Sequence, residues 1–160
     1  MKKWILAVLL ILFTIPVLAT TLQSGVEVKR IPNSFYGSWR VVSQRVSTTN
    51  EAMFKQKSID FWNISRESDV IKLENPFSGA RQSVSMKDVN SKFIKFTKIG
   101  NYNGATLTDE VTITLDKDSF VGVNEIKLDK VSDIDGHVMK TERAVYNIKG
   151  EKVSGTSVGE

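Results

Sequence analysis

The sequence predicts an all-β domain in which about eight antiparallel strands form a meander and close into a barrel. Short segments with alternating apolar and polar side chains recur along the chain, and short turn sequences separate them. Almost no segment has the residue spacing of an amphipathic helix. Because closure removes unpaired edge strands, a barrel is favoured over an open sheet, and a β-sandwich is the alternative.

The first half of the predicted domain mixes β-branched and aromatic residues with polar ones, as half-buried strands do. Residues 75–79 form a strong turn cluster. Residues 51–56 are the only passage rich in helix formers, and we expect a short lid or crossover helix there. The strands predicted in this half are 39–46, 59–66, 70–74 and 80–89.

The second half alternates more clearly, above all where Val111 and Ile113 share one strand face and Glu110 and Thr112 share the other. The Asp135-Gly136 dipeptide fits a two-residue hairpin, because both residues accept positive φ. The strands predicted in this half are 92–99, 107–115, 119–128 and 138–148.

Residues 1–19 match a secretory signal peptide. Lys2 and Lys3 precede a long apolar run, and Ala19 provides the small residue expected before a cleavage site. The short basic start favours a bacterial protein that is periplasmic or secreted and keeps no stable membrane span after processing. An uncleaved N-terminal anchor is the alternative. We expect an extended lead-in over 20–35, the barrel domain over 36–155 and a flexible tail over 156–160.

The composition disfavours several classes of function. The formal net charge is +4, part of it lies in the signal peptide, and the remaining charges of both signs are interspersed, so nucleic-acid binding is not expected. The chain has no cysteine and one histidine, His137, which lies beside a predicted turn. Cysteine-based catalysis is thereby excluded, and a water-shielded serine triad or a zinc site is disfavoured. We therefore expect no enzyme, no cofactor and no metal site.

The segment Gly37-Ser38-Trp39, at the start of the first predicted strand, resembles the first motif of the lipocalins and the wider calycin group. In those families the tryptophan closes one end of the barrel, and an arginine near the last strand packs over its indole. The resemblance implies the first role for Trp39 and the second for Arg143. The alternative is that Trp39 is a core aromatic of an unrelated β-fold.

The predicted function is to hold one small apolar or amphipathic molecule inside the barrel. The alternative is a protein-interaction module, such as a protease inhibitor or an envelope assembly factor, that acts through Phe77 and Tyr102 in its loops. The first hypothesis requires a hollow barrel and the second accepts a solid one. The candidate ligand-binding residues are Trp39, Val41, Ser43, Val111, Ile113, Phe120, Asn124 and Arg143.

Overall fold

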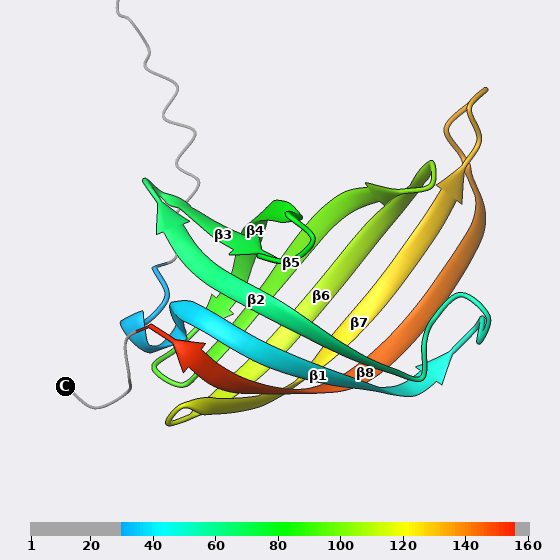
Figure 1. Cartoon of the computed structure of the whole chain (residues 1–160). Coiled ribbons are helices and arrows are strands. Elements are labelled where there is room, and N and C mark those ends of the chain that lie inside the picture. Colours follow the sequence, from blue (N-terminus) through cyan, green and yellow to red (C-terminus); the bar gives the residue numbers. More distant parts are fainter. Residues whose placement is uncertain (1–29, 156–160) are drawn as a thin grey trace, which may run out of the picture.

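A computed structural model describes residues 30–155, which form a closed barrel of eight antiparallel strands in sequence order (Figure 1). Each strand pairs with the next, and β8 pairs with β1 to complete the barrel. The predicted meander and its closure are therefore confirmed, and the sandwich alternative is wrong. The strands are β1 (Gly37–Thr48), β2 (Lys57–Glu67), β3 (Val70–Glu74), β4 (Arg81–Val89), β5 (Phe93–Tyr102), β6 (Ala105–Asp116), β7 (Ser119–Val131) and β8 (Val138–Ser154).

One end of the barrel, the closed end, carries the segment before β1 and the β2–β3, β4–β5 and β6–β7 turns. The prediction of an extended lead-in is wrong for its last residues, because Asn33–Phe35 form a short 3-10 helix, η1. Burial explains the difference: Phe35 has no exposed surface, and its carbonyl accepts a hydrogen bond of 2.9 Å from Trp39 Nε1. Segment 30–36 therefore closes this end of the barrel. The predicted signal peptide and tail lie outside the described residues.

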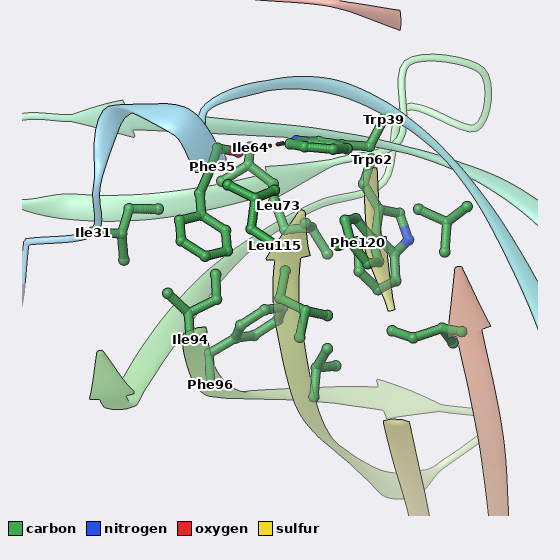
Figure 2. Close-up of a cluster of buried hydrophobic side chains, with 14 of the residues drawn as sticks. Ile31, Phe35, Trp39, Trp62, Ile64, Leu73, Ile94, Phe96, Leu115 and Phe120 are labelled. Atoms are coloured by element: carbon green, nitrogen blue, oxygen red, sulfur yellow. Dashed lines mark hydrogen bonds between the residues drawn. The ribbon is translucent and has the colours of Figure 1, made fainter. Parts of the chain in front are cut away.

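Apolar side chains fill the half of the barrel next to the closed end (Figure 2). The Phe120 ring packs against both Trp39 and Trp62, with ring centroids 5.2 and 6.0 Å apart. Gly150 of β8 leaves the space for that ring, because a Cβ at this position would collide with it. This half of the barrel is a solid core.

The opposite end, the open end, carries the β1–β2, β3–β4, β5–β6 and β7–β8 loops. The β1–β2 loop, residues 49–56, is here called the mouth loop. The helix predicted within it does not form; a single backbone bond of 3.2 Å from Phe54 N to the Asn50 carbonyl closes one turn. Six residues are too few to sustain a helix, and Phe54 is instead buried against the core. Within residues 30–155, no helix has the length and apolar character needed to cross a bilayer.

Candidate functional site: a polar cavity in the open half

The inward-facing side chains change from apolar to polar on the way to the open end. On β2 the buried Ile64 and Trp62 are followed by Asp60, and on β5 the buried Ile94 and Phe96 are followed by Lys98. Since inward residues lie two apart along a strand, each polar residue continues the apolar row of its own strand. The same change brings Ser43, Asp109, Asn124 and Tyr146 to the inner wall.

These polar side chains enclose a cavity of about 330 Å³. Met53 and Phe54 of the mouth loop line the cavity on the side of the open end, and Trp62 lies on its border with the solid core. A wider hollow of about 640 Å³ shares Asp60, Trp62 and Lys98 with the cavity. The two hollows therefore meet at these residues, in the open half of the barrel.

The wider hollow follows a seam between β4 and β5. The backbone pairing of these two strands begins at Ser85–Thr97 and continues only toward the closed end. Nearer the open end, the side-chain amide of Gln82 donates to the carbonyl of Ile99 and holds the strands together without a backbone ladder. Residues of both strands line the hollow here, so it extends from the cavity to the seam.

Asp60 and Asp109, the two carboxylates that line the cavity, both have polar partners. Lys98 Nζ lies 2.6 Å from Asp109 Oδ2 and 5.9 Å from the centre of the Trp62 ring. Asp60 accepts a bond of 3.1 Å from Trp62 Nε1 and another from the Asn75 side-chain amide. These contacts fix the indole of Trp62 and compensate the buried charges, which would otherwise be costly to remove from water.

Two acceptor atoms in the cavity have no partner. Asp109 and Asn124 are only 7% and 9% exposed, and the Oδ1 atom of each is buried without a hydrogen bond. In residues 30–155 only one other buried side-chain atom lacks a partner, Thr97 Oγ1, and Thr97 does not line the cavity. A buried acceptor without a partner costs about 1–3 kcal/mol, and these two oxygens, which have almost no accessible surface, therefore destabilise the wall beside the cavity.

Hydrogen bonds from two strands of the barrel hold the mouth loop in place. The Tyr146 hydroxyl of β8 donates a bond of 3.0 Å to the Lys55 carbonyl, and Arg45 Nη1 of β1 donates to the Phe54 carbonyl. Burial raises the pKa of the Tyr146 hydroxyl, so this group remains a donor at neutral pH. Both contacts hold the loop over the cavity.

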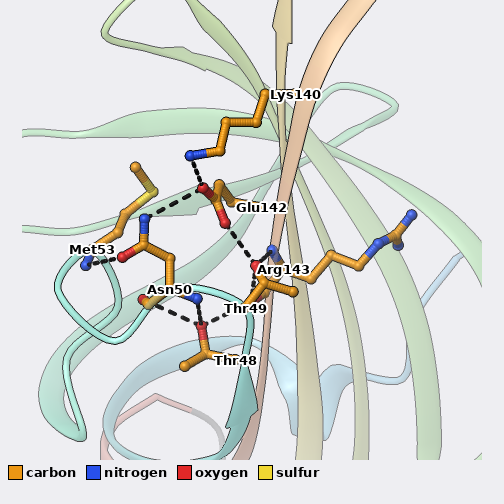
Figure 3. A network of polar contacts seen from close by, with 7 residues as sticks. All are labelled: Thr48, Thr49, Asn50, Met53, Lys140, Glu142 and Arg143. Atoms are coloured by element: carbon orange, nitrogen blue, oxygen red, sulfur yellow. Dashed lines mark hydrogen bonds and ion pairs between the residues drawn. The ribbon is translucent and has the colours of Figure 1, made fainter.

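A polar network fastens the start of the mouth loop to β8 (Figure 3). The Thr49 hydroxyl donates a bond of 2.8 Å to Glu142 Oε2, and Asn50 Nδ2 donates one of 3.3 Å to Glu142 Oε1. Lys140 Nζ lies 2.5 Å from the same Oε1 atom. The Lys140 ammonium and the Thr49 hydroxyl hold the pKa of the Glu142 carboxyl below its usual value. The network therefore depends on an ionised Glu142.

The structure brings two of the predicted ligand residues, Ser43 and Asn124, to the cavity. Arg143 is exposed on the outer face, because the inward positions of β8 are taken by Ala144 and Tyr146. The cation over Trp39 is instead Lys152, whose Nζ lies 4.8 Å from the ring centre. The other predicted ligand residues belong to the solid core, away from the cavity: Trp39, Val41, Val111, Ile113 and Phe120.

Sequence reasoning missed Asp60, Lys98, Asp109 and Tyr146. The signal was present, since each is a polar residue or a tyrosine at an inward-facing position of a predicted strand. The predicted loop residues Phe77 and Tyr102 are both exposed, but Tyr102 is the last residue of β5 and not part of a loop. The Phe77 ring packs edge-on against Phe61, with ring centroids 4.7 Å apart.

His137 is exposed in the β7–β8 loop, and its Nδ1 lies 2.5 Å from Asp135 Oδ1. It does not line the cavity. In the part of the chain that the structure describes, no group of three or more histidine, cysteine, aspartate or glutamate side chains is arranged to hold a metal ion.

No protein-family model matches the chain, and no curated protein matches it. A solved structure described as "Structure of EF1p2_mFAP2b bound to DFHBI" is similar over 73% of this chain and 93% of that chain, with 15% sequence identity and a TM-score of 0.44. At this TM-score the likeness carries no argument, and the barrel architecture rests on the strand pairing described above.

Proposed function

We propose that this protein binds one small amphipathic molecule in the cavity of the open half of the barrel and catalyses no reaction on it. The observation that carries the proposal is the cavity of about 330 Å³, whose wall combines polar side chains such as Asp109 and Asn124 with the ring of Trp62. Cavities of about 300–1,000 Å³ with a few convergent polar groups are typical of small-molecule sites. An amphipathic ligand fits better than a purely apolar one, because polar and apolar groups contribute about equally to the wall.

Two further observations support the proposal. The solid core next to the closed end makes a rigid floor, so a ligand would rest on Trp62 rather than pass through the barrel. The one histidine, His137, is exposed on a loop outside the cavity, which gives the cavity no imidazole for acid–base catalysis. These features favour binding over catalysis.

We also propose that the barrel is related to the lipocalins. Trp39 is fully buried at the closed end and lies under a cation, as the resemblance implies, although the cation is Lys152 in place of Arg143. Export through the N-terminal signal, to the periplasm or beyond, belongs to the same proposal.

A cavity-blocking variant tests the function. Ser43 lines the cavity from β1, while the next residue, Gln44, is exposed on the outside. We expect Ser43→Phe to abolish the one-site binding of N-phenyl-1-naphthylamine, measured by the rise of its fluorescence, because the new ring occupies the ligand volume. Gln44→Phe adds the same ring outside the barrel and should bind the probe as the parent protein does. Equal binding by all three proteins would place the probe elsewhere and overturn the proposal.

A second candidate function, partner binding through exposed side chains, is favoured by three large apolar residues in or beside the loops. Phe77 is 77% exposed and Ile134 97% exposed, each on a different loop, and Tyr102 is exposed at the end of β5. Loops on a rigid scaffold often carry the residues that bind a partner. Chemical crosslinking in envelope fractions tests it: the Phe77→Ala, Tyr102→Ala double variant should lose a crosslinked partner that Ser43→Phe retains.

A further inference from the structure

We propose that the ligand of the cavity is uncharged and accepts a hydrogen bond from the ammonium group of Lys98. The inference rests on the proposed binding function and names the chemical class of the ligand. Its basis is the place of Lys98, which lines both the cavity and the wider hollow, together with the balance of charged side chains around each of them.

The charged side chains around the two hollows are balanced in number. The cavity is lined by two basic and two acidic side chains, which are Lys55, Lys98, Asp60 and Asp109. The wider hollow shares Lys98 and Asp60 with it. Its other charged residues, Arg81 and Glu74, form an ion pair with each other. Neither hollow therefore offers a surplus charge that would compensate a charged ligand for its lost hydration.

The carboxylates of the cavity are already bonded and leave little for a cationic ligand. Asp60 accepts hydrogen bonds from Trp62 and Asn75, one on each oxygen. Asp109 gives its Oδ2 to Lys98, and its Oδ1 has almost no accessible surface. A carboxylate on the ligand would in turn lie near both aspartates and be repelled by them. An uncharged ligand avoids both penalties.

Lys98 is the charged group of the cavity that keeps hydrogen-bond donors for a ligand. It faces Asp109 directly across the β5–β6 ladder, and its Nζ lies 2.6 Å from Asp109 Oδ2. Among residues 30–155, Asp109 is its one polar partner, whereas an ammonium group carries three N–H donors. The Lys98 side chain is 15% exposed and lines both hollows. A ligand oxygen placed where the hollows meet can therefore accept from Lys98 without displacing Asp109.

Four probes with one ring system test the inference by their displacement of N-phenyl-1-naphthylamine from the mature protein. The probe 1-acetylnaphthalene carries a carbonyl oxygen, 1-ethylnaphthalene lacks it, and 1-naphthylmethylamine and 1-naphthylacetate carry opposite charges. We expect both charged probes to bind at least about tenfold more weakly than 1-acetylnaphthalene, because neither hollow compensates their loss of hydration.

A matched pair of double variants locates the hydrogen bond. The double variant Lys98→Met, Asp109→Asn replaces the inner ion pair by uncharged side chains, so the preference for 1-acetylnaphthalene over 1-ethylnaphthalene should fall by about tenfold. The control is the ion pair between Lys95 and Glu110, which joins the same two strands on the outer face with an Nζ–Oε1 distance of 2.5 Å. The double variant Lys95→Met, Glu110→Gln should leave the preference unchanged, and circular dichroism checks that both proteins keep the barrel.

Removing only the negative charge gives an independent test in the opposite direction. In Asp109→Asn, Lys98 keeps its charge and loses its anionic partner, so 1-naphthylacetate should bind at least about tenfold more tightly than it binds the parent protein. Glu110→Gln makes the same kind of change on the outer face and should leave the affinity for 1-naphthylacetate as it is. A damaged cavity would weaken the binding of every probe, so a loss of structure does not produce this gain.

The outcomes separate this inference from the proposed function. If Ser43→Phe abolishes the binding of N-phenyl-1-naphthylamine but either charged probe binds more tightly than 1-acetylnaphthalene, the cavity binds ligands and their assigned class is wrong. A preference for 1-acetylnaphthalene that persists in Lys98→Met, Asp109→Asn overturns the role of Lys98, and so does an affinity for 1-naphthylacetate that Asp109→Asn does not raise. If N-phenyl-1-naphthylamine does not bind the parent protein, both proposals are wrong.

Discussion

Trp39 shows how one residue supports the whole closed end of the barrel. Its indole N–H bonds to the Phe35 carbonyl, its ring packs against Phe120, and Lys152 lies over its face. Burial of the Lys152 ammonium lowers its pKa, which indicates that this cation is partly withdrawn from water by the same packing. The side chain therefore joins η1, β1, β7 and β8.

We expect Trp39→Ala to lower the free energy of unfolding by about 3–5 kcal/mol, because it leaves a large cavity in a packed core. Urea denaturation followed by circular dichroism measures the change. Tyr102→Ala, which truncates an exposed aromatic ring at the open end, should change stability by only about 0.5 kcal/mol or less. A small effect at Trp39 would contradict the packing described here.

At the level of single residues, the sequence predicted buried positions better than roles. The alternation around Val111 and Ile113 places both side chains inside the barrel, where the structure has them. It does not reveal whether an inward side chain meets a ligand or another side chain, because that depends on rings from distant strands. Phe120 fills the space beneath the cavity only because Gly150, which lies on another strand, leaves room for its ring.

The mouth loop is the element on which access to the cavity depends. Glu142 holds its start through Thr49 and Asn50, and the folded state lowers the pKa of Glu142 relative to its usual value near 4.5. A carboxylate of this kind contributes stability above its unfolded-state pKa and loses that contribution as the pH falls through its lowered folded-state pKa. The attachment of the loop should therefore weaken in acid.

We expect the backbone amides of Thr49 and Phe54, which donate to Arg143 and Asn50, to lose protection from hydrogen exchange relative to the β6–β7 ladder as the pH falls below the usual pKa of a glutamate. Nuclear magnetic resonance, with exchange rates corrected for the intrinsic effect of pH, measures it. Glu142→Gln should show the weakened state already at neutral pH and little further change in acid. Loop protection that is independent of pH in the parent protein would refute this role for Glu142.

Strand order followed from the sequence because each strand carries its own local signal, namely alternation bounded by turn residues. The mouth loop did not, because its helix-forming composition acts over too few residues and the burial of Phe54 outweighs it. The predicted two-residue hairpin at Asp135-Gly136 is wrong: residues 132–137 form a longer loop in which Gly136 alone has positive φ. The seam between β4 and β5 could not be predicted from the sequence either. It depends on where one ladder ends and on a side-chain bond from Gln82, neither of which leaves a local pattern.

At the scale of the whole molecule, closure of the sheet is the main source of order in a chain that has no cysteine and hence no disulfide. The antiparallel ladder is continuous from β1 around to β8, and the longest pairings are those of β6–β7 and β7–β8. Barrel closure was predictable from the number of strands and their short connections. The division of its interior into a solid half and a polar half was not, because it depends on all strands together.

We expect the mature protein in its native host to begin at Thr20, because Lys2 and Lys3, the apolar run and Ala19 together form a processing signal. Intact mass spectrometry of envelope fractions measures the mass of the exported chain. Substituting Ala19→Arg should block processing and leave the full-length precursor. A species that retains Met1 and sediments with membranes would show that the segment is an anchor.

Both ends of the described chain leave the barrel on the side away from the mouth (Figure 1). Gly37 and Gly155 approach each other closely there, and Lys152 Nζ donates a bond of 2.8 Å to the Ser34 carbonyl. Any tether joined to either end, whether a linker to another protein or a bead in a binding assay, would consequently present the opening outward. Immobilised protein should retain its full capacity for ligand, and a fluorescent label at either end would report rotation of the molecule without obstructing the opening.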